Sequence, residues 1–351
     1  MDRTPTTIKG RGAASNPQGR FEELARQSEV DEEIKPRPET VVVLQPARSI
    51  ISRNNSPDLP FNQSINPYQG CEHGCIYCYA RPSHAYLGLS PGLEFETRLF
   101  AKENAGKLLR RELSRPGYRC ELISLGANTD PYQPVEREHR VTRGVLEVLW
   151  EFRHPVGIVT KGSLIERDLD LLEAMARENL VEVFVSIGSL DRDIARTLEP
   201  RAAAPYRRVE TIRRLAALGI PVGTFVAPII PFLNDKDMEG VLEAVSEAGA
   251  CMASYTLLRL PWEVKGLFKD WLERHYPLKS KHVMARIRDA RGGRENDPDF
   301  GSRMRGEGEF AELLRRRFEV ACRRFGLNAG GRTGLDCSKF SRPGPRQGVL
   351  L

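Results

Sequence analysis

The stretch Asn66–Arg81, NPYQGCEHGCIYCYAR, contains Cys71, Cys75 and Cys78 in the spacing C-x3-C-x2-C. Thiolates are the usual protein ligands of iron–sulfur clusters, and a cubane cluster has four irons to coordinate. Three closely spaced cysteines hold three of these irons and leave the fourth free for a small molecule, as catalytic metal sites keep one position open. The motif therefore predicts a [4Fe–4S] cluster with one iron open to a ligand.

A zinc site is the alternative use of these cysteines. Structural zinc sites usually combine two ligand pairs, such as C-x2-C with a second pair elsewhere. Cys322 and Cys337 do not form such a pair, and His73 lies between two of the cysteines, which is a poor position for a tetrahedral ligand. The alternative function is thus a non-catalytic protein that binds zinc or a structural cluster and serves assembly or nucleic-acid contact.

The composition is typical of a globular protein. The 351 residues are 40% hydrophobic and 28% charged, enough for one large core with appendages or for two domains. No run approaches the ~20 apolar residues of a membrane span, and the start, MDRTPTTIKGRGAAS, contains no apolar secretory signal. Without an export signal the seven cysteines belong in a reducing compartment, so we expect a cytoplasmic protein with no membrane partner.

Around the motif, short β-prone runs alternate with amphipathic helical stretches, which is typical of parallel βαβ units. The expected strands are 61–65, 122–125, 156–160, 181–187, 222–227 and 254–258, with an earlier run at 41–44. The helical patterns between them are 99–113, 145–152, 169–177, 209–218 and 238–248.

Six such strands favour an α/β fold in the form of a partial, TIM-like (β/α)6 barrel, although a doubly wound open sheet has the same alternation. We expect three parts in the chain. They are a flexible N-terminal segment (1–39), a barrel core (40–260) and a mainly helical, basic C-terminal extension (261–351).

The cysteine motif resembles that of the radical S-adenosylmethionine superfamily, in which an aromatic residue, here Tyr77, precedes the last cysteine. Together with LGANTDPYQPVE at Leu125–Glu136, it resembles the subfamily that includes spore photoproduct lyase and its uncharacterised relatives. The resemblance implies that the open iron binds S-adenosylmethionine. It also implies reductive cleavage of that cofactor to methionine and a 5′-deoxyadenosyl radical, which abstracts a hydrogen atom from a substrate. The protein then supplies binding, orientation and exclusion of side reactions.

Polar residues that follow the expected strands are candidates for binding S-adenosylmethionine, because residues past the strand ends face the active site of a (β/α) barrel. Besides Tyr77 they are Asn128, Asp130, Lys161 and Ser186. Asn128 and Asp130 have short polar side chains but are also common turn residues. The resemblance implies that Lys161 and Ser186 help to hold the cofactor, whose carboxylate a lysine neutralises. A surface cation and a turn serine are the alternatives.

Three further residues have open roles. Arg259 ends the sixth expected strand and is a candidate for binding an anionic substrate, with an ordinary surface charge as the alternative. Glu136 lies just past a turn, and for this residue too an ordinary surface charge is the alternative to a role in the site. A thiol such as that of Cys337 can return a hydrogen atom to a product radical, but a lone late cysteine is more often a small apolar filler.

The substrate and the reaction type stay open at the level of sequence. Residues 281–351 contain 16 Lys and Arg against 9 Asp and Glu, which suits nucleic acid, while the mixing of the charges suits a solvated surface. A peptide or small metabolite is the other substrate class, favoured by the lack of an obvious aromatic–basic stacking face. The chemistry also calls for a partner that donates electrons, such as a reductase or a protein of the flavodoxin or ferredoxin type.

Overall fold

The computed structural model describes residues 7–21, 38–330 and 334–343, and it confirms the expected α/β fold. In these residues the main sheet has the strand order β10-β9-β8-β7-β6-β3-β2. Neighbouring strands from β3 to β10 run parallel, and only β2, at one edge, pairs antiparallel. Since β2 and β10 are the two edges and do not pair, the sheet is an open, partial barrel.

The strands of the main sheet lie close to the expected runs. Their bounds are β2 (Ile51–Arg53), β3 (Gln63–Ile65), β6 (Ile123–Leu125), β7 (Val156–Thr160), β8 (Val181–Ser186), β9 (Val222–Ile229) and β10 (Met252–Leu257). Every residue of β3, β6 and β8 is buried. Burial on both faces is typical of parallel strands covered by helices.

A second, smaller sheet has the order β1-β5-β4 and consists of β1 (Val41–Leu44), β4 (Tyr68–Gln69) and β5 (Arg98–Ala101). Strand β5 shows that the expected helix over 99–113 was wrong in its first turn. Leu99 pairs with Val42 of β1, so a long-range ladder overrides the local pattern. Helix α2 (Ala105–Leu113) begins only after Asn104, whose side chain bonds the backbone N–H and C=O of Ala47 at 2.9 and 3.0 Å.

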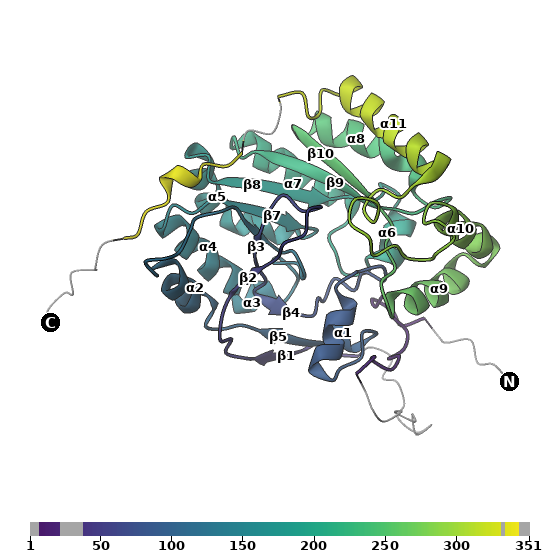
Figure 1. Cartoon of the computed structure of the whole chain (residues 1–351), viewed down its shortest axis with the longest axis horizontal. Helices are drawn as coiled ribbons and strands as arrows, with labels where there is room; N and C mark the ends of the chain where they lie inside the picture. Colours follow the sequence, from purple (N-terminus) through teal and green to yellow (C-terminus); the bar gives the residue numbers. More distant parts are fainter. Residues whose placement is uncertain (1–6, 22–37, 331–333, 344–351) are drawn as a thin grey trace, which may run out of the picture.

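Helices cover the outside of the curved sheet in chain order (Figure 1). Those between the strands are α3 (Glu136–His139), α4 (Val141–Glu151), α5 (Leu169–Arg177), α6 (Arg192–Leu198), α7 (Pro205–Ala217) and α8 (Met238–Glu247). Helix α1 (Glu94–Thr97) and the 3-10 turns η1 (Arg81–Leu87), η2 (Ser163–Asp168) and η3 (Asp235–Asp237) lie in the connections.

The C-terminal part is mainly helical, as expected, with α9 (Val264–His275), α10 (Pro277–Asp289) and α11 (Gly308–Arg324). Helices α9 and α10 share an apolar cluster with residues of the barrel loops, among them Ile76 of the cysteine motif and Leu198. Helix α11 packs against α8 at the top of the view in Figure 1. The extension therefore packs directly on the barrel.

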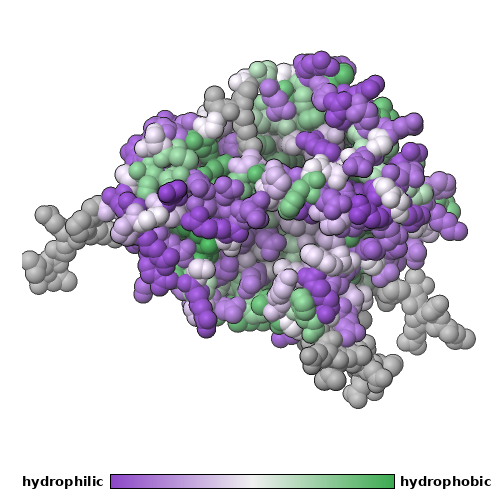
Figure 2. Space-filling view, viewed as in Figure 1, coloured by the Kyte–Doolittle hydropathy of each residue, from purple (hydrophilic) through white to green (hydrophobic). Residues whose placement is uncertain are grey.

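Ion pairs account for much of the basic charge of this part. Arg315 and Arg316 pair with Glu312 on the same helix, and Arg317 pairs with Glu239 of α8 at 2.6 Å. The surface view of Figure 2 is largely hydrophilic, with apolar side chains in small, separate areas. Among the described helices, none has the length and apolar composition needed to cross a membrane.

The C-terminal tail, with the short turn η4 (Cys337–Lys339), docks where the strands begin. The thiol of Cys337 lies close enough to that of Cys120, which precedes β6, to interact with it electrostatically, so it lies at the opposite end of the barrel from the cysteine motif. Phe340 packs edge-on against His154, with ring centres 5.5 Å apart. A role for Cys337 as hydrogen-atom donor at the motif does not fit this position.

His154 makes the docking of the tail sensitive to pH. Burial lowers its pKa to about 4, although Nδ1 donates to the carbonyl of Pro155 at 2.9 Å. The unfolded chain, with an ordinary histidine pKa near 6.5, binds a proton more readily than the folded chain. Stability from His154 is therefore complete above pH 6.5 and is lost as the pH falls toward 4.

We predict that wild-type protein loses about 2 kcal/mol of stability between pH 7 and pH 5 through His154. Urea unfolding at both values, for wild type and His154→Gln, measures it. The variant should show a smaller loss over this interval, whereas His282→Gln, at an exposed histidine, should behave as wild type. Equal losses in wild type and His154→Gln would contradict the assignment.

Candidate functional site

The cysteine motif lies on a loop after β4, at the edge where the parallel strands end. Cys71 and Cys75 are buried, Cys78 is half-buried, and all three are free thiols. Burial is the main cause that raises the pKa of Cys71 well above its ordinary value and that of Cys75 to about 12. Cys71 also interacts electrostatically with the other two, so the thiols are gathered in one place.

The donor set fits an iron–sulfur cluster. In the described part of the chain, no three His, Cys, Asp or Glu side chains converge on the position of a single metal ion. A cubane does not require such convergence, because each thiolate binds a different iron. Three free thiols on one loop supply one thiolate for each of three irons. The positively charged Lys161 lies close enough to Cys75 to interact with it electrostatically.

Arg81 holds the cysteine loop from within. Its side chain is completely buried, and its guanidinium donates to the carbonyls of Gly74 at 3.1 Å and Cys75 at 2.8 Å. It also pairs with the buried carboxylate of Glu96 at 2.5 Å. These acceptors compensate for the hydration that the cation loses on burial, so Arg81 fixes the backbone on both sides of Cys75, the second sulfur ligand.

The N-terminal residues 11–13 close over this loop. The backbone N–H groups of Gly12 and Ala13 donate to the carboxylate of Glu96 at 3.0 and 2.9 Å. Gly12 is so close to the loop that a Cβ there would lie 1.9 Å from the carbonyl oxygen of Gly74. Residues 7–21 contain no helix or strand, as the composition led us to expect, but several of them are buried against the site.

Asp130 ties three segments together. Its carboxylate accepts from the hydroxyl of Thr160 at 2.6 Å and from the backbone N–H of Lys161 at 2.7 Å, and it lies 3.2 Å from Nδ1 of His73. Burial alone would raise the pKa of Asp130, but His73 and these hydrogen bonds hold it at about 2. Oδ1 of Asp130 also accepts from the backbone N–H of Tyr132 at 2.9 Å, which fixes the loop on which Asp130 lies. The carboxylate is thus occupied by protein groups.

Asn128 lies beside Asp130, half-buried, on a loop that Asn66 organises. The side-chain oxygen of Asn66 accepts the backbone N–H of Asn128 at 2.7 Å and that of Thr129 at 3.3 Å. No hydrogen bond joins the side-chain amide of Asn128 to another described residue, so it is available to a ligand. Asn66 was not among the expected site residues, although it opens the motif.

Tyr77 and Lys161 face each other at the same edge, with the ammonium 5.9 Å from the ring centre. The hydroxyl of Tyr77 donates to Glu199, which pairs with the buried Arg208. Burial works against the charge of Glu199, but Arg208 and Lys161 lower its pKa below the ordinary value. The ammonium of Lys161 makes no hydrogen bond to another described residue.

Ser186 is buried at the end of β8, where its carbonyl accepts from Arg208 at 2.9 Å. Next to it, Tyr77 and Glu199 line a small pocket together with residues of α6 and of the loop after β8. The structure therefore brings Tyr77, Lys161 and Ser186 to one edge of the sheet. Glu199 and Arg208 also belong to this site, although no sequence motif near them predicted it.

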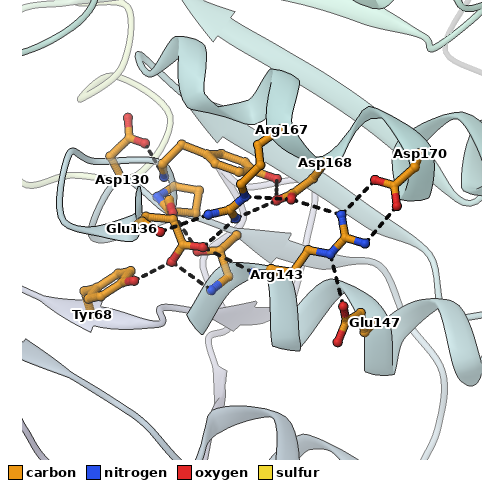
Figure 3. Close-up of polar contacts among 11 residues, drawn as sticks. Tyr68, Asp130, Glu136, Arg143, Glu147, Arg167, Asp168 and Asp170 are labelled. Atoms are coloured by element: carbon orange, nitrogen blue, oxygen red, sulfur yellow. Dashed lines mark hydrogen bonds and ion pairs between the residues drawn. The ribbon is translucent and has the colours of Figure 1, made fainter. Parts of the chain in front are cut away.

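Glu136 belongs to a buried polar network rather than to the surface (Figure 3). Its carboxylate accepts from the hydroxyl of Tyr68 and from Arg167 at 2.7 Å. Arg167 in turn pairs with the buried Asp168, which Arg143 also approaches at 3.3 Å. The network joins the start of α3 to the turn after β7, and the burial of Glu136 rules out its interpretation as a surface charge.

Comparison with known proteins agrees with this geometry. Residues 65–245 match the sequence profile of the Radical SAM superfamily. An uncharacterised protein of Mycobacterium tuberculosis is 37% identical over 225 residues, which is 64% of this chain and 66% of that protein. An uncharacterised protein of Methanocaldococcus jannaschii is 27% identical over 213 residues, 61% of this chain and 76% of the relative. The chain thus spans just under two thirds of the mycobacterial relative.

Among solved structures, spore photoproduct lyase in complex with dinucleoside spore photoproduct has a similar fold. The TM-score is 0.59 at 17% identity, over 82% of this chain and 80% of the lyase. A partial barrel of parallel strands with three cysteines on one loop at the carboxyl edge defines a class of cluster-binding α/β proteins. This chain belongs to the radical SAM superfamily, whose members combine an iron–sulfur cluster with S-adenosylmethionine.

We predict that Gly12→Ala displaces the N-terminal segment from the cysteine loop, because the new methyl group has no space beside Gly74. The expected loss is about 1–3 kcal/mol of stability, as for other overpacked sites. Hydrogen exchange should accelerate at residues 11–17. Gly240→Ala, in open space on α8, is the matched control and should leave exchange there unchanged. Wild-type exchange in Gly12→Ala would contradict the packing.

A second variant tests the network of Figure 3. Glu136→Gln removes the charge that faces Arg167 and should cost about 3 kcal/mol, because it leaves a cation short of its buried partner. Glu147→Gln also removes a carboxylate that contacts the network, but its side chain is 56% exposed, and we expect a change under about 0.5 kcal/mol. Urea unfolding compares the two, and similar small losses would show that the network is not stabilising.

Proposed function

We propose that this protein is a radical S-adenosylmethionine enzyme with a [4Fe–4S] cluster on Cys71, Cys75 and Cys78. When bound and reduced, the cluster supplies the electron that cleaves S-adenosylmethionine into methionine and a 5′-deoxyadenosyl radical, which abstracts hydrogen from the substrate. The observation that carries the proposal is the loop of three free, gathered thiols at the carboxyl edge of a partial barrel, in a chain of this superfamily.

The protein's own residues bind and orient the cofactor in this proposal. Lys161 holds an ammonium without a described hydrogen-bond partner beside the cysteines, where it is suited to bind a carboxylate. The ring of Tyr77 and the amide of Asn128 line the same edge. Asp130 is a positioning residue, because its oxygens are taken by Thr160 and by the N–H of Lys161.

Two partners complete the proposal. The cluster needs an electron from a reductase or from a flavodoxin- or ferredoxin-type protein. For the substrate we propose a nucleic acid or a part of one, with a peptide or small metabolite as the alternative. The likeness to spore photoproduct lyase supports the fold alone, so the substrate class rests on the chemistry of the side chains around the site.

We predict that protein reconstituted without oxygen, with iron and sulfide, binds about four irons per chain. Given S-adenosylmethionine and dithionite, it should form 5′-deoxyadenosine, which chromatography detects. Cys71→Ala should lose both properties, because the cluster then lacks one of its three ligands. Cys251→Ala, at an exposed cysteine outside the motif, is the matched control and should keep both.

Elemental analysis decides between the proposed enzyme and the alternative zinc-binding protein. Zinc near one per chain with negligible iron, after preparation without oxygen, would overturn the proposal in favour of a zinc-binding protein. Full cluster retention in Cys71→Ala would also overturn it, because the cysteine motif would then not be the cluster site.

A further inference from the structure

Arg259 lies at the open edge of the barrel, directly beyond β10. Because β10 runs parallel to β9 and ends at the same edge, Arg259 belongs to the side of the molecule that carries the cysteine loop. Its guanidinium lies 5.7 Å from the ring centre of Tyr79, the residue after Cys78. The arginine is thus close to the site without being part of the loop that holds the cysteines.

The guanidinium of Arg259 has few hydrogen-bond acceptors and no described carboxylate to balance its charge. Among the described residues its one hydrogen-bonding contact is from Nη1 to the sulfur of Met304, at 3.7 Å, and a thioether is a weak acceptor. Nε is buried and has no partner in the described part of the chain. Within the described ranges, no carboxylate pairs with Arg259. Nη2 also has no hydrogen-bond partner among the described residues and, unlike Nε, is not fully buried, so it is the donor that a carboxylate or phosphate oxygen can reach.

Three fully buried arginines of the described chain, by contrast, have several strong acceptors each. Arg81 reaches Glu96 and several carbonyls, Arg208 reaches Glu199 and two carbonyls, and Arg291 donates to four carbonyls. Each of these side chains has a structural reason to be buried. Arg259 has none of comparable strength, and a partly buried cation without a counter-charge is costly to the fold.

The acidic residues near Arg259 are already engaged. Asp58 pairs with Arg303 at 2.6 Å, and Asp297 accepts from Ser302 at 2.6 Å and lies 3.4 Å from Arg294. Burial is the main cause that lowers the pKa of Arg259, and the nearby charge of Arg303 lowers it further, whereas Tyr79, Asp58 and Asp297 act in the opposite direction. An added anion would offset the repulsion from Arg303.

Aromatic rings flank this cationic edge. Tyr79 is 50% exposed beside Arg259, Phe300 is 58% exposed under Arg303 and Trp262 is 66% exposed under Arg20. Exposed rings next to arginines bind bases by stacking while the arginines bind phosphates. The stacking face that the sequence did not reveal is therefore assembled here from segments far apart in the chain.

We propose that Arg259 binds a phosphate group of a nucleotide-containing substrate through Nη2 of its guanidinium, with the ring of Tyr79 as the adjacent stacking surface. This inference rests on the proposed function and names the substrate class of the same site. A phosphate accepts from the unpaired Nη2 donor and supplies the missing negative charge. The base attached to it then lies next to the cysteine loop, where hydrogen abstraction takes place.

The test uses cluster-loaded protein, a fluorescein-labelled ten-nucleotide single-stranded DNA and thymidine monophosphate as probes. Fluorescence anisotropy, with competition by the monophosphate, gives both affinities. Arg259→Gln should weaken binding about tenfold, and Arg259→Lys should restore only part of it, because lysine keeps the charge but not the planar fork. Arg213→Gln, which removes an exposed charge on α7, is the matched control and should change affinity less than about twofold.

Salt dependence and stability separate binding from a structural role. Loss of one phosphate contact should reduce the salt slope of oligonucleotide binding by about 1 in Arg259→Gln. The melting temperature of the free protein should stay the same or rise, since no ion pair is lost. A lower melting temperature with unchanged affinity would overturn the inference and make Arg259 structural.

The outcomes also distinguish the sources of the phosphate. Binding of both probes, each weakened by Arg259→Gln, supports a nucleic acid, whereas binding of the monophosphate alone supports a free nucleotide. Wild-type protein that binds neither probe overturns the inference. In that case 5′-deoxyadenosine formation without substrate shows that the proposed function still holds, and its absence shows that the proposed function has failed as well.

Discussion

The structure around the site depends on one buried ion pair, between Arg81 of the cysteine motif and Glu96 of α1. Arg81 fixes the loop through the carbonyls of Gly74 and Cys75, and Glu96 fixes the N-terminal segment through Gly12. Breaking such a pair leaves an unpaired buried charge, which costs about 3–5 kcal/mol. The positions of the three thiols therefore depend on contacts that lie outside the cysteines themselves.

Most of the barrel was predictable from the sequence because each parallel strand is a short, continuous apolar run followed by an amphipathic helix. Strand β5 was not, since its pairing with β1 is a long-range contact that no local pattern records. The same limit applies to the site. Cys71, Cys75 and Cys78 are close in sequence and were recognised, whereas Glu96, Glu199 and Arg208 join the site only through the fold.

The basic helix α11 and the cysteine edge of the barrel differ in how their positive charges are compensated. The basic C-terminal helix α11 neutralises much of its own charge with Glu312 and with Glu239 of α8. At the cysteine edge, by contrast, Lys161 lies beside the thiols and Arg259 lacks a described carboxylate partner. A ligand that carries both a carboxylate and a phosphate, or two ligands that carry one each, would complement this edge.

The most direct test of the central claim is electron paramagnetic resonance of the dithionite-reduced, cluster-loaded protein with and without S-adenosylmethionine. If three cysteines hold the cluster and one iron is open to the cofactor, the account predicts a reduced-cluster signal whose g-values change when S-adenosylmethionine is added. An identical spectrum in both samples, or no cluster signal at all, would contradict it.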